Sequence, residues 1–162
     1  MSCSNSKEVL ESIVAEALRS LGFHAQTNVK LPAKGGEVEI DVWATKSVGR
    51  SELRVYVSCK NWDRDVGKKV VDGELGRVLQ LHQSPHLKVL VVKRLTEPAR
   101  KAALDDGFFV IELGEKASTS NAREVYDIVY SKLKEIIGIA PEKIKSVVER
   151  LRSALKELEG LV

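Results

Sequence analysis

Two short runs of alternating side chains constrain the fold of this 162-residue chain more than any other feature. Residues 37–44 and 53–60 both alternate between apolar and polar side chains, which is the period of a strand with one buried face. A polar connection joins the two runs, so they predict an antiparallel hairpin. The apolar side chains expected to share a face are Val38, Ile40 and Val42 in the first run and Val55, Val57 and Cys59 in the second.

Helical and strand patterns on both sides of this hairpin indicate an α/β protein. Apolar residues recur at helical spacing in residues 8–21 and 70–81, and Thr96 is an N-cap candidate for a third helix that Gly107 ends. Further strands are expected at residues 26–31, Leu87–Val92 and 108–113, and the last two are continuous apolar runs typical of buried strands. The order predicts a mixed central β-sheet flanked by helices.

Two more helices, residues 121–137 and 141–158, follow this unit. In the second, the apolar residues are spaced alternately by four and three positions, as in a coiled coil or a helical hairpin: Ile144, Val148, Leu151, Leu155 and Leu158. We therefore divide the chain into residues 1–118 and a C-terminal two-helix extension, residues 119–162. We expect the extension to be a helical hairpin that joins two copies into a homodimer, the alternative being that it folds back over its own sheet.

Composition excludes several classes of protein. No segment approaches the roughly 20 uninterrupted apolar residues of a membrane span, and no signal segment precedes the first helix, so a soluble, cytoplasmic protein is expected. The two cysteines, Cys3 and Cys59, are too few for a disulfide framework. No glycine-rich phosphate-binding loop is present, so ATP and NAD are not expected as cofactors.

The positive charge is concentrated in the middle of the chain. Residues 46–101 contain thirteen Lys and Arg but only six Asp and Glu, whereas the whole chain has a net charge of +3. Such a segment favours a phosphate-rich partner, although basic surfaces also occur in proteins without one.

Polar side chains occupy neighbouring positions on the two hairpin strands, where a sheet usually carries apolar ones. Glu37, Glu39 and Asp41 project from the first strand, and Ser58 and Lys60 from the second. Hydrolysis of a phosphodiester uses a divalent cation held by carboxylate oxygens, together with a cation near the attacking water or the scissile phosphate. Asp41 and Lys60 could supply both functions, and a simple cross-strand ion pair is the alternative.

The same residues carry a resemblance to a known family. Glu39-Ile40-Asp41-Val42, followed by Val57-Ser58-Cys59-Lys60-Asn61-Trp62, resembles the PD-(D/E)xK nucleases, most closely the Mrr-like restriction endonucleases and their archaeal relatives. The resemblance covers residues 7–113 and implies a restriction-endonuclease-like fold, a Mg²⁺ or Mn²⁺ cofactor and DNA as substrate. By position, Asp41 would be the metal-binding acid, Lys60 the catalytic lysine and Glu11 the helix acid that often completes the site.

The chain departs from this family at Ser58, where the family has Glu, Asp or Gln. Some restriction enzymes of the class carry Ser-x-Lys and take the missing carboxylate from the helix that follows. Glu74 lies fourteen residues after Lys60 in the expected helix, although the family's Arg before that Glu is Gly73 here. Glu39 is the other candidate.

Together these features predict a metal-dependent DNA endonuclease of restriction, repair or recombination. The candidate metal ligands are Asp41, Glu74, Glu39 and Glu11, and the residues expected to contact nucleic acid are Lys60, Trp62, Arg64, Lys68 and Lys69. A catalytically inactive DNA-binding or assembly subunit with the same fold is the alternative function. RNA is a third, less favoured substrate.

Overall fold

Five strands form one mixed sheet, in the order in which they follow along the chain. The computed structural model describes residues 3–116, 121–138 and 141–160. β1, β2 and β3 are antiparallel, whereas β4 and β5 run parallel to β3. The strands are β1 (His24–Ala33), β2 (Gly36–Val48), β3 (Ser51–Lys60), β4 (Leu87–Val92) and β5 (Phe108–Glu112). The predicted α/β class and the mixed sheet are confirmed.

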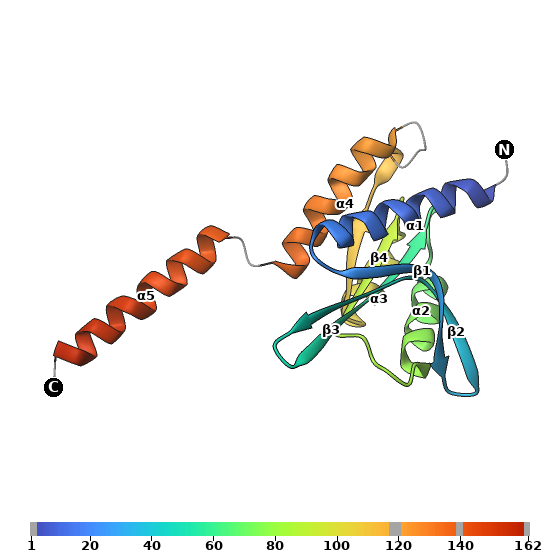
Figure 1. Ribbon diagram of the computed structural model, residues 1–162. Helices are drawn as coiled ribbons and strands as arrows, with labels where there is room; N and C mark the ends of the chain where they lie inside the picture. Colours follow the sequence, from blue (N-terminus) through green and yellow to red (C-terminus); the bar gives the residue numbers. More distant parts are fainter. Residues whose placement is uncertain (1–2, 117–120, 139–140, 161–162) are drawn as a thin grey trace.

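Helices cover both faces of the sheet (Figure 1). α1 (Cys3–Ser20) and α4 (Ala122–Ile137) pack on one face, and α2 (Lys68–Gln80) and α3 (Glu97–Asp105) on the other. A short 3-10 turn, η1 (Gly114–Lys116), follows β5, and α5 (Pro141–Gly160) is the last helix. β4 is buried on both faces, as its continuous apolar run predicted, because Val89 and Val91 face α1 and α4 while Leu90 and Val92 face α2 and α3.

Local signals fix the ends of several elements. The hydroxyl of Thr96 accepts a hydrogen bond from the backbone N–H of Ala99 at 3.2 Å, which confirms it as the N-cap of α3. Gly22, with φ +92°, follows the end of α1 in the left-handed region that glycine tolerates best. β5 differs from its prediction as a buried strand: it forms an edge of the sheet, and Phe109 is 42% exposed.

α4 packs against α1 rather than against α5. Val125, Val129 and Leu133 of α4 are buried in the same core as residues of α1 and of that face of the sheet. The helical hairpin expected from the sequence is therefore not what the structure shows. The predicted boundary after residue 118 falls outside the described residues.

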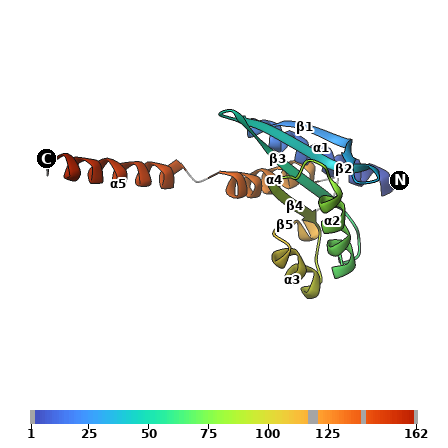
Figure 2. The same cartoon turned by 90° about the horizontal axis from the view of Figure 1, so that it is seen from below.

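α5 extends away from the rest of the chain in both ribbon views (Figures 1 and 2). Four residues of its predicted apolar seam are exposed: Val148, Leu151, Leu155 and Leu158. The side chain of the fifth, Ile144, lies outside the described residues. None of the helices in the described ranges combines the length and the apolar character that crossing a membrane requires.

Candidate active site

The hairpin of β2 and β3 opens into a fork next to Asp41. Pairing between the two strands runs from Val48 and Ser51 to Val42 and Val57, and ends there. Past this point the outer half of β2 pairs with β1, while β3 continues beside β4 as far as Lys60. The strands therefore diverge where the sequence places its two main candidate residues, and side chains of α2 line the opening.

β2 also changes face at Asp41. Val38 and Ile40 belong to the core beneath α2 and α3, whereas Val42 belongs to the core beneath α1 and α4. The prediction that these three residues share one face is therefore wrong. In the pairing of β1 with β2, Asn28 and Asp41 lie opposite each other but are not among the paired residues. The φ of Asn28, +50°, lies in the left-handed region.

This local break turns the outer half of the β1–β2 hairpin toward α2 (Figure 1). The turn of that hairpin is fastened to the end of α2, because the backbone N–H of Lys34 donates a hydrogen bond to the carbonyl of Gln80 at 2.8 Å. Alternation alone could not reveal the change, since it assumes a strand whose pairing is uninterrupted.

The carboxylate of Asp41 spans the fork. Its Oδ2 accepts a hydrogen bond from the backbone N–H of Cys59 at 2.8 Å, so a side chain replaces the main-chain acceptor that a continued ladder would supply. Its Oδ1 lies 3.3 Å from Nζ of Lys7, near the start of α1. With 14% of its side chain exposed, Asp41 is held from two sides but remains open to the cavity.

Glu11 of α1 reaches the same ammonium. Its side chain is only 2% exposed, Oε2 accepts a hydrogen bond from Asn28 at 2.9 Å, and Oε1 lies 3.6 Å from Nζ of Lys7. Burial and the charge of Asp41 raise the pKa of Glu11. Burial lowers the pKa of Lys7, but the charges of Asp41 and Glu11 outweigh this effect and raise it.

A second buried acid holds Lys60. Oε1 of Glu74 lies 2.9 Å from Nζ of Lys60, and Oε2 accepts a hydrogen bond from the hydroxyl of Tyr56. Burial alone would raise the pKa of Glu74, but Lys60, Tyr56 and the guanidinium of Arg77 lower it. Burial and the charge of Glu74 raise the pKa of Tyr56, which therefore remains a hydrogen-bond donor.

Glu74 contacts the two residues that flank Ser58 on its face of β3. Tyr56 and Lys60 are two positions before and after Ser58 on the same face of β3, and the Glu74 carboxylate contacts both. Ser58 is buried, and its Oγ has no hydrogen-bond partner in the described part of the chain. The small side chain at position 58 thus leaves room for a carboxylate that comes from α2 instead of from the strand.

A cavity of about 480 Å³ joins these groups. It brings together Asp41, Lys60, Glu74 and Glu39, and Lys7 connects it to Glu11. The side chain of Glu39 is exposed, while its backbone carbonyl accepts a hydrogen bond from Arg77. The lining residues are Lys7, Asn28, Glu37, Val38, Glu39, Asp41, Tyr56, Lys60, Glu74, Arg77 and Gln80.

Sequence reasoning missed two charged residues of this cavity, Lys7 and Arg77. Lys7 precedes Glu11 by four positions and Arg77 follows Glu74 by three, so each lies next to a candidate acid on the same side of a helix. That spacing was the available signal. Within the described residues, no group of three or more His, Cys, Asp or Glu side chains is arranged to hold a metal ion.

Trp62 and Arg64 lie on the loop that follows Lys60. The guanidinium of Arg64 lies 4.9 Å from the centre of the Trp62 ring, and Nζ of Lys60 lies 5.7 Å from it. Both distances permit cation–π attraction. Trp62 also packs against the core beneath α2 and α3 while remaining partly exposed, so this packing is compatible with the predicted contact with DNA.

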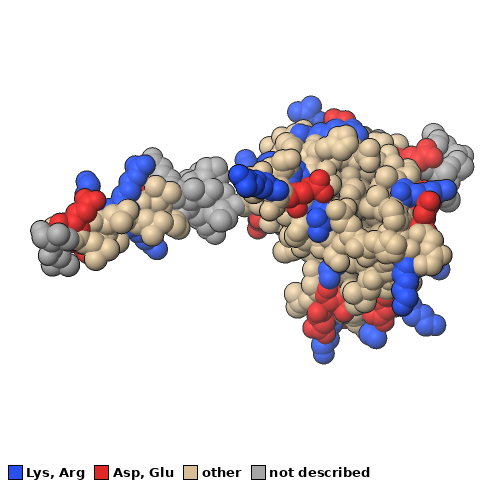
Figure 3. Space-filling model, turned by 60° about the horizontal axis from the view of Figure 1, so that its bottom comes forward, with Lys and Arg blue, Asp and Glu red and all other residues tan. Residues whose placement is uncertain are grey.

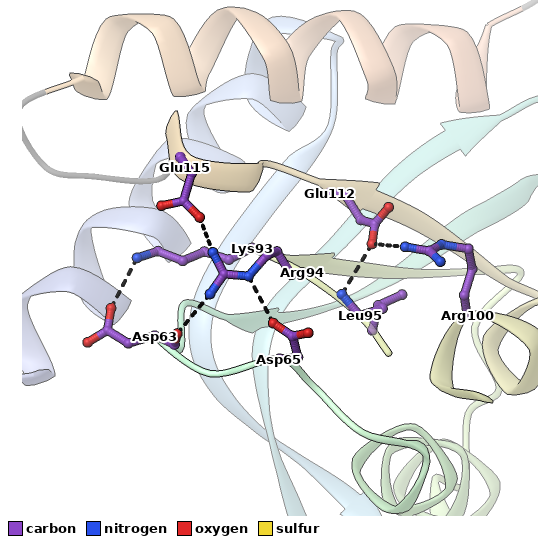
Figure 4. A network of polar contacts seen from close by, with 8 residues as sticks. All are labelled: Asp63, Asp65, Lys93, Arg94, Leu95, Arg100, Glu112 and Glu115. Carbon is purple, nitrogen blue, oxygen red and sulfur yellow. Dashed lines mark hydrogen bonds and ion pairs between the residues drawn. The ribbon is translucent and has the colours of Figure 1, made fainter. Parts of the chain in front are cut away.

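A surface network fastens this loop to the ends of β4 and β5 (Figure 4). Arg94 donates to Asp65 at 2.8 Å, to the carbonyl of Asp63 at 2.9 Å and to Glu115. Lys93 pairs with Asp63 at 3.1 Å. Exposed ion pairs contribute little singly, but here several share Arg94 and restrain one loop.

Charges of both signs intermingle on the surface shown in Figure 3. Two cations of the basic segment are paired with acids from outside it, Arg100 with Glu112 at 2.7 Å and Arg94 with Glu115, whereas Lys68 pairs with Asp72 within the segment at 3.3 Å. The excess charge of residues 46–101 is therefore partly neutralised in the fold. Lys68 and Lys69 are exposed at the start of α2.

Three solved structures resemble this chain. A protein of unknown function, AF1548, is 24% identical over 89% of this chain and 78% of its own, with a TM-score of 0.59. MspJI restriction endonuclease in complex with a 27-mer oligonucleotide is 18% identical over 90% of this chain and 36% of its own, with a TM-score of 0.47. The DNA modification-dependent restriction endonuclease AspBHI is 17% identical over 95% of this chain and 41% of its own, with a TM-score of 0.43.

The chain thus spans less than half the length of the MspJI and AspBHI chains. None of the curated proteins matches it. The family model Mrr_cat, described as restriction endonuclease, matches residues 4–116, a range that contains Glu11, Asp41, Lys60 and Glu74. The chain therefore belongs to the Mrr_cat family of restriction endonucleases.

Proposed function

We propose that this chain is a divalent-metal-dependent endonuclease that hydrolyses the phosphodiester bonds of DNA. The observation that carries the proposal is the fork between β2 and β3, which gives Asp41 and Lys60 access to one cavity lined by further charged side chains. Membership of a restriction endonuclease family supports DNA as the substrate.

The residues around Lys7 fit a divalent cation. Asp41 and Glu11 each have one oxygen fixed by a protein donor, and the other oxygen of each faces the same ammonium. Among the described residues, Oε1 of Glu11 is buried without a hydrogen-bond partner, which is unfavourable until a cation of higher charge than the Lys7 ammonium binds it. Magnesium commonly uses one or two carboxylates and keeps several waters, so these two acids suffice.

Bound Mg²⁺ or Mn²⁺ would polarise the scissile phosphate and lower the pKa of a coordinated water. In this proposal Asp41 and Glu11 hold the metal, and the ammonium of Lys60 binds the phosphate or orients the attacking water. Glu74 has both oxygens engaged by Lys60 and Tyr56, so we assign it the role of positioning Lys60. That Glu74 or Glu39 is itself a metal ligand stays a prediction.

DNA would pass along the loop after β3 and the start of α2. Arg64, Lys68 and Lys69 are exposed there, and Trp62 offers an aromatic face beside Lys60. We assign the three cations to backbone phosphates, because contacts of this kind position a duplex without reading its sequence.

A duplex has two strands to cut, and α5 supplies a means of pairing two copies. Leu151, Leu155 and Leu158 are 60%, 57% and 61% exposed, at a spacing typical of a helix that packs on another helix. We therefore include in the proposal a two-fold dimer formed through α5.

The test is cleavage of supercoiled plasmid by the purified full chain with Mg²⁺ or Mn²⁺ and with EDTA. Asp41→Asn keeps an acceptor for Cys59, and Lys60→Met keeps the length of the side chain, so both test chemistry with little change in shape. Cleavage should require the metal and be lost in both variants. Lys132→Met, at an exposed position of α4, is the matched control and should cleave normally.

Two other outcomes would give different answers. DNA binding without cleavage under all metal conditions would favour the inactive DNA-binding or assembly subunit. Cleavage of RNA in place of plasmid, single-stranded and branched DNA would assign the other substrate.

A further inference from the structure

The point at which Asp41 and Glu11 meet is filled by a side chain of the protein itself. Nζ of Lys7 lies 3.3 Å from Oδ1 of Asp41 and 3.6 Å from Oε1 of Glu11. The other oxygens of the two acids are held by Cys59 and Asn28. The carboxylates are therefore prearranged around one positive charge, and in the described structure Lys7 provides it.

The contacts of Lys7 are unequal. The 3.3 Å distance to Asp41 permits a hydrogen bond, whereas Oε1 of Glu11 has no hydrogen-bond partner in the part of the chain that the structure describes. An ammonium carries one charge and donates along three directions, so it neutralises this pair of acids less completely than a divalent ion would. Lys7 is also 48% exposed on a side chain with four rotatable bonds, so it can turn outward into water.

We propose that Lys7 is an internal counter-ion that competes with the divalent metal for Asp41 and Glu11 and so sets the metal affinity of the site. This inference rests on the proposed metal-dependent function. Two cations at one point repel each other, so metal binding must displace the ammonium, and the free energy of the lysine contacts is subtracted from that of metal binding. Lys7 is thereby a determinant of metal affinity that takes no part as a ligand.

The direct test is titration of the full chain with Mn²⁺, without DNA, with free Mn²⁺ followed by electron paramagnetic resonance. Lys7→Met removes the charge but keeps an unbranched side chain of similar length. We expect it to bind Mn²⁺ about tenfold more tightly than the wild type, a difference of about 1.4 kcal/mol. Lys7→Arg keeps the charge and should bind no more tightly than the wild type.

Any lost positive charge slightly favours cation binding, so a control of equal charge is needed. Lys132→Met makes the same chemical change at an exposed position of α4 and should leave the affinity near that of the wild type. Thermal unfolding gives a second readout. In EDTA, Lys7→Met should melt below the wild type because its two acids face each other without a counter-ion, and saturating Mn²⁺ should raise its melting temperature more than that of the wild type.

The outcomes separate this inference from the function on which it rests. Equal Mn²⁺ affinity of the wild type and Lys7→Met, with binding lost in Asp41→Asn, would overturn the role of Lys7 and leave the metal site intact. Absence of Mn²⁺ binding in every variant would overturn both the metal site and the competition.

Discussion

The carboxylate of Glu74 lies 2.9 Å from the ammonium of Lys60, although fourteen positions separate the two residues in the sequence. The same carboxylate also accepts a hydrogen bond from Tyr56, so it contacts both residues that flank Ser58 on one face of β3. An acid from α2 therefore stands next to the candidate catalytic lysine, where the family pattern would have an acid on the strand itself. This arrangement explains how Ser58 is compatible with a charged site.

Moving the acid from position 74 on α2 to position 58 on β3 tests this arrangement. We expect Glu74→Ala to slow plasmid cleavage at least about tenfold, because Lys60 loses its partner, and Ser58→Glu alone to destabilise the fold by bringing two carboxylates into one buried place. The double variant should recover much of both losses. In a double-mutant cycle on urea unfolding, the coupling between the two sites should be about 1 to 3 kcal/mol, and simple additivity would contradict the arrangement.

The two buried acids predict opposite effects of pH on stability. The pKa of Glu11 is raised in the folded protein, so its ionised form destabilises the fold. This loss of stability is complete above the raised pKa and vanishes below 4.5, the value in the unfolded chain. Glu11→Gln should therefore be more stable than the wild type at pH 7 in EDTA, by about 1 kcal/mol, because the buried orphaned oxygen no longer carries charge. The difference should disappear below about pH 4.5.

The pKa of Glu74 is lowered in the folded protein, so its ionised form stabilises the fold. This stabilisation is complete above 4.5, the value in the unfolded chain, and is lost as the pH falls through the lowered pKa. Glu74→Gln should thus be less stable than the wild type at pH 7 and approach it in acid. Urea unfolding of both variants from pH 3 to pH 8 measures the two effects. Parallel pH profiles for Glu11→Gln and Glu74→Gln would contradict the assigned environments.

The two C-terminal helices should respond differently to substitution. Leu151→Glu combined with Leu155→Glu should turn a dimer into a monomer in light scattering, without changing the unfolding of the sheet domain, because both side chains are exposed in one copy. Leu133→Ala should do the reverse: it should cost about 2 to 5 kcal/mol of stability and keep the oligomeric state, since Leu133 is buried against α1. A wild-type monomer at tens of micromolar would rule out the proposed dimer.

Binding of duplex DNA should weaken as the salt concentration rises, because each phosphate contact releases counterions. In a plot of log affinity against log salt concentration, each contact adds about −0.9 to the slope. Lys69→Gln should reduce the magnitude of the wild-type slope by about one phosphate contact. Fluorescence anisotropy between 50 and 300 mM KCl, roughly the range in which such contacts are lost, measures both slopes. Lys132→Gln is the control, and a flat wild-type response would argue against a DNA partner.

The sequence predicted where the strands lie, but not how β2 breaks at Asp41 or which element α4 packs against. Alternation located β2 and β3, because side-chain period reports burial directly, and the apolar run of β4 predicted its two covered faces. The fork at Asp41 was not predictable, since it depends on an interrupted pair with Asn28 on another strand. α4 was assigned to the wrong neighbour for a similar reason: an apolar stripe shows that a helix is buried, but not against what.

For the site, spacing identified Glu74 as a candidate, and the structure places it beside Lys60. Spacing could place Lys7 one helical turn before Glu11, but not beside Asp41, because that contact depends on how α1 meets β2. A charged residue near a helix start reads as an ordinary surface group until its partner on another element is known.

The hydrogen bond from Cys59 to Asp41 has an evolutionary consequence. Cys59 is fully buried, so an alanine at position 41 would leave its amide without an acceptor, at a cost of about 1 to 3 kcal/mol. A relative without nuclease activity would still be under selection to keep an acceptor there. Retention of this aspartate in a relative is thus weak grounds for inferring catalysis.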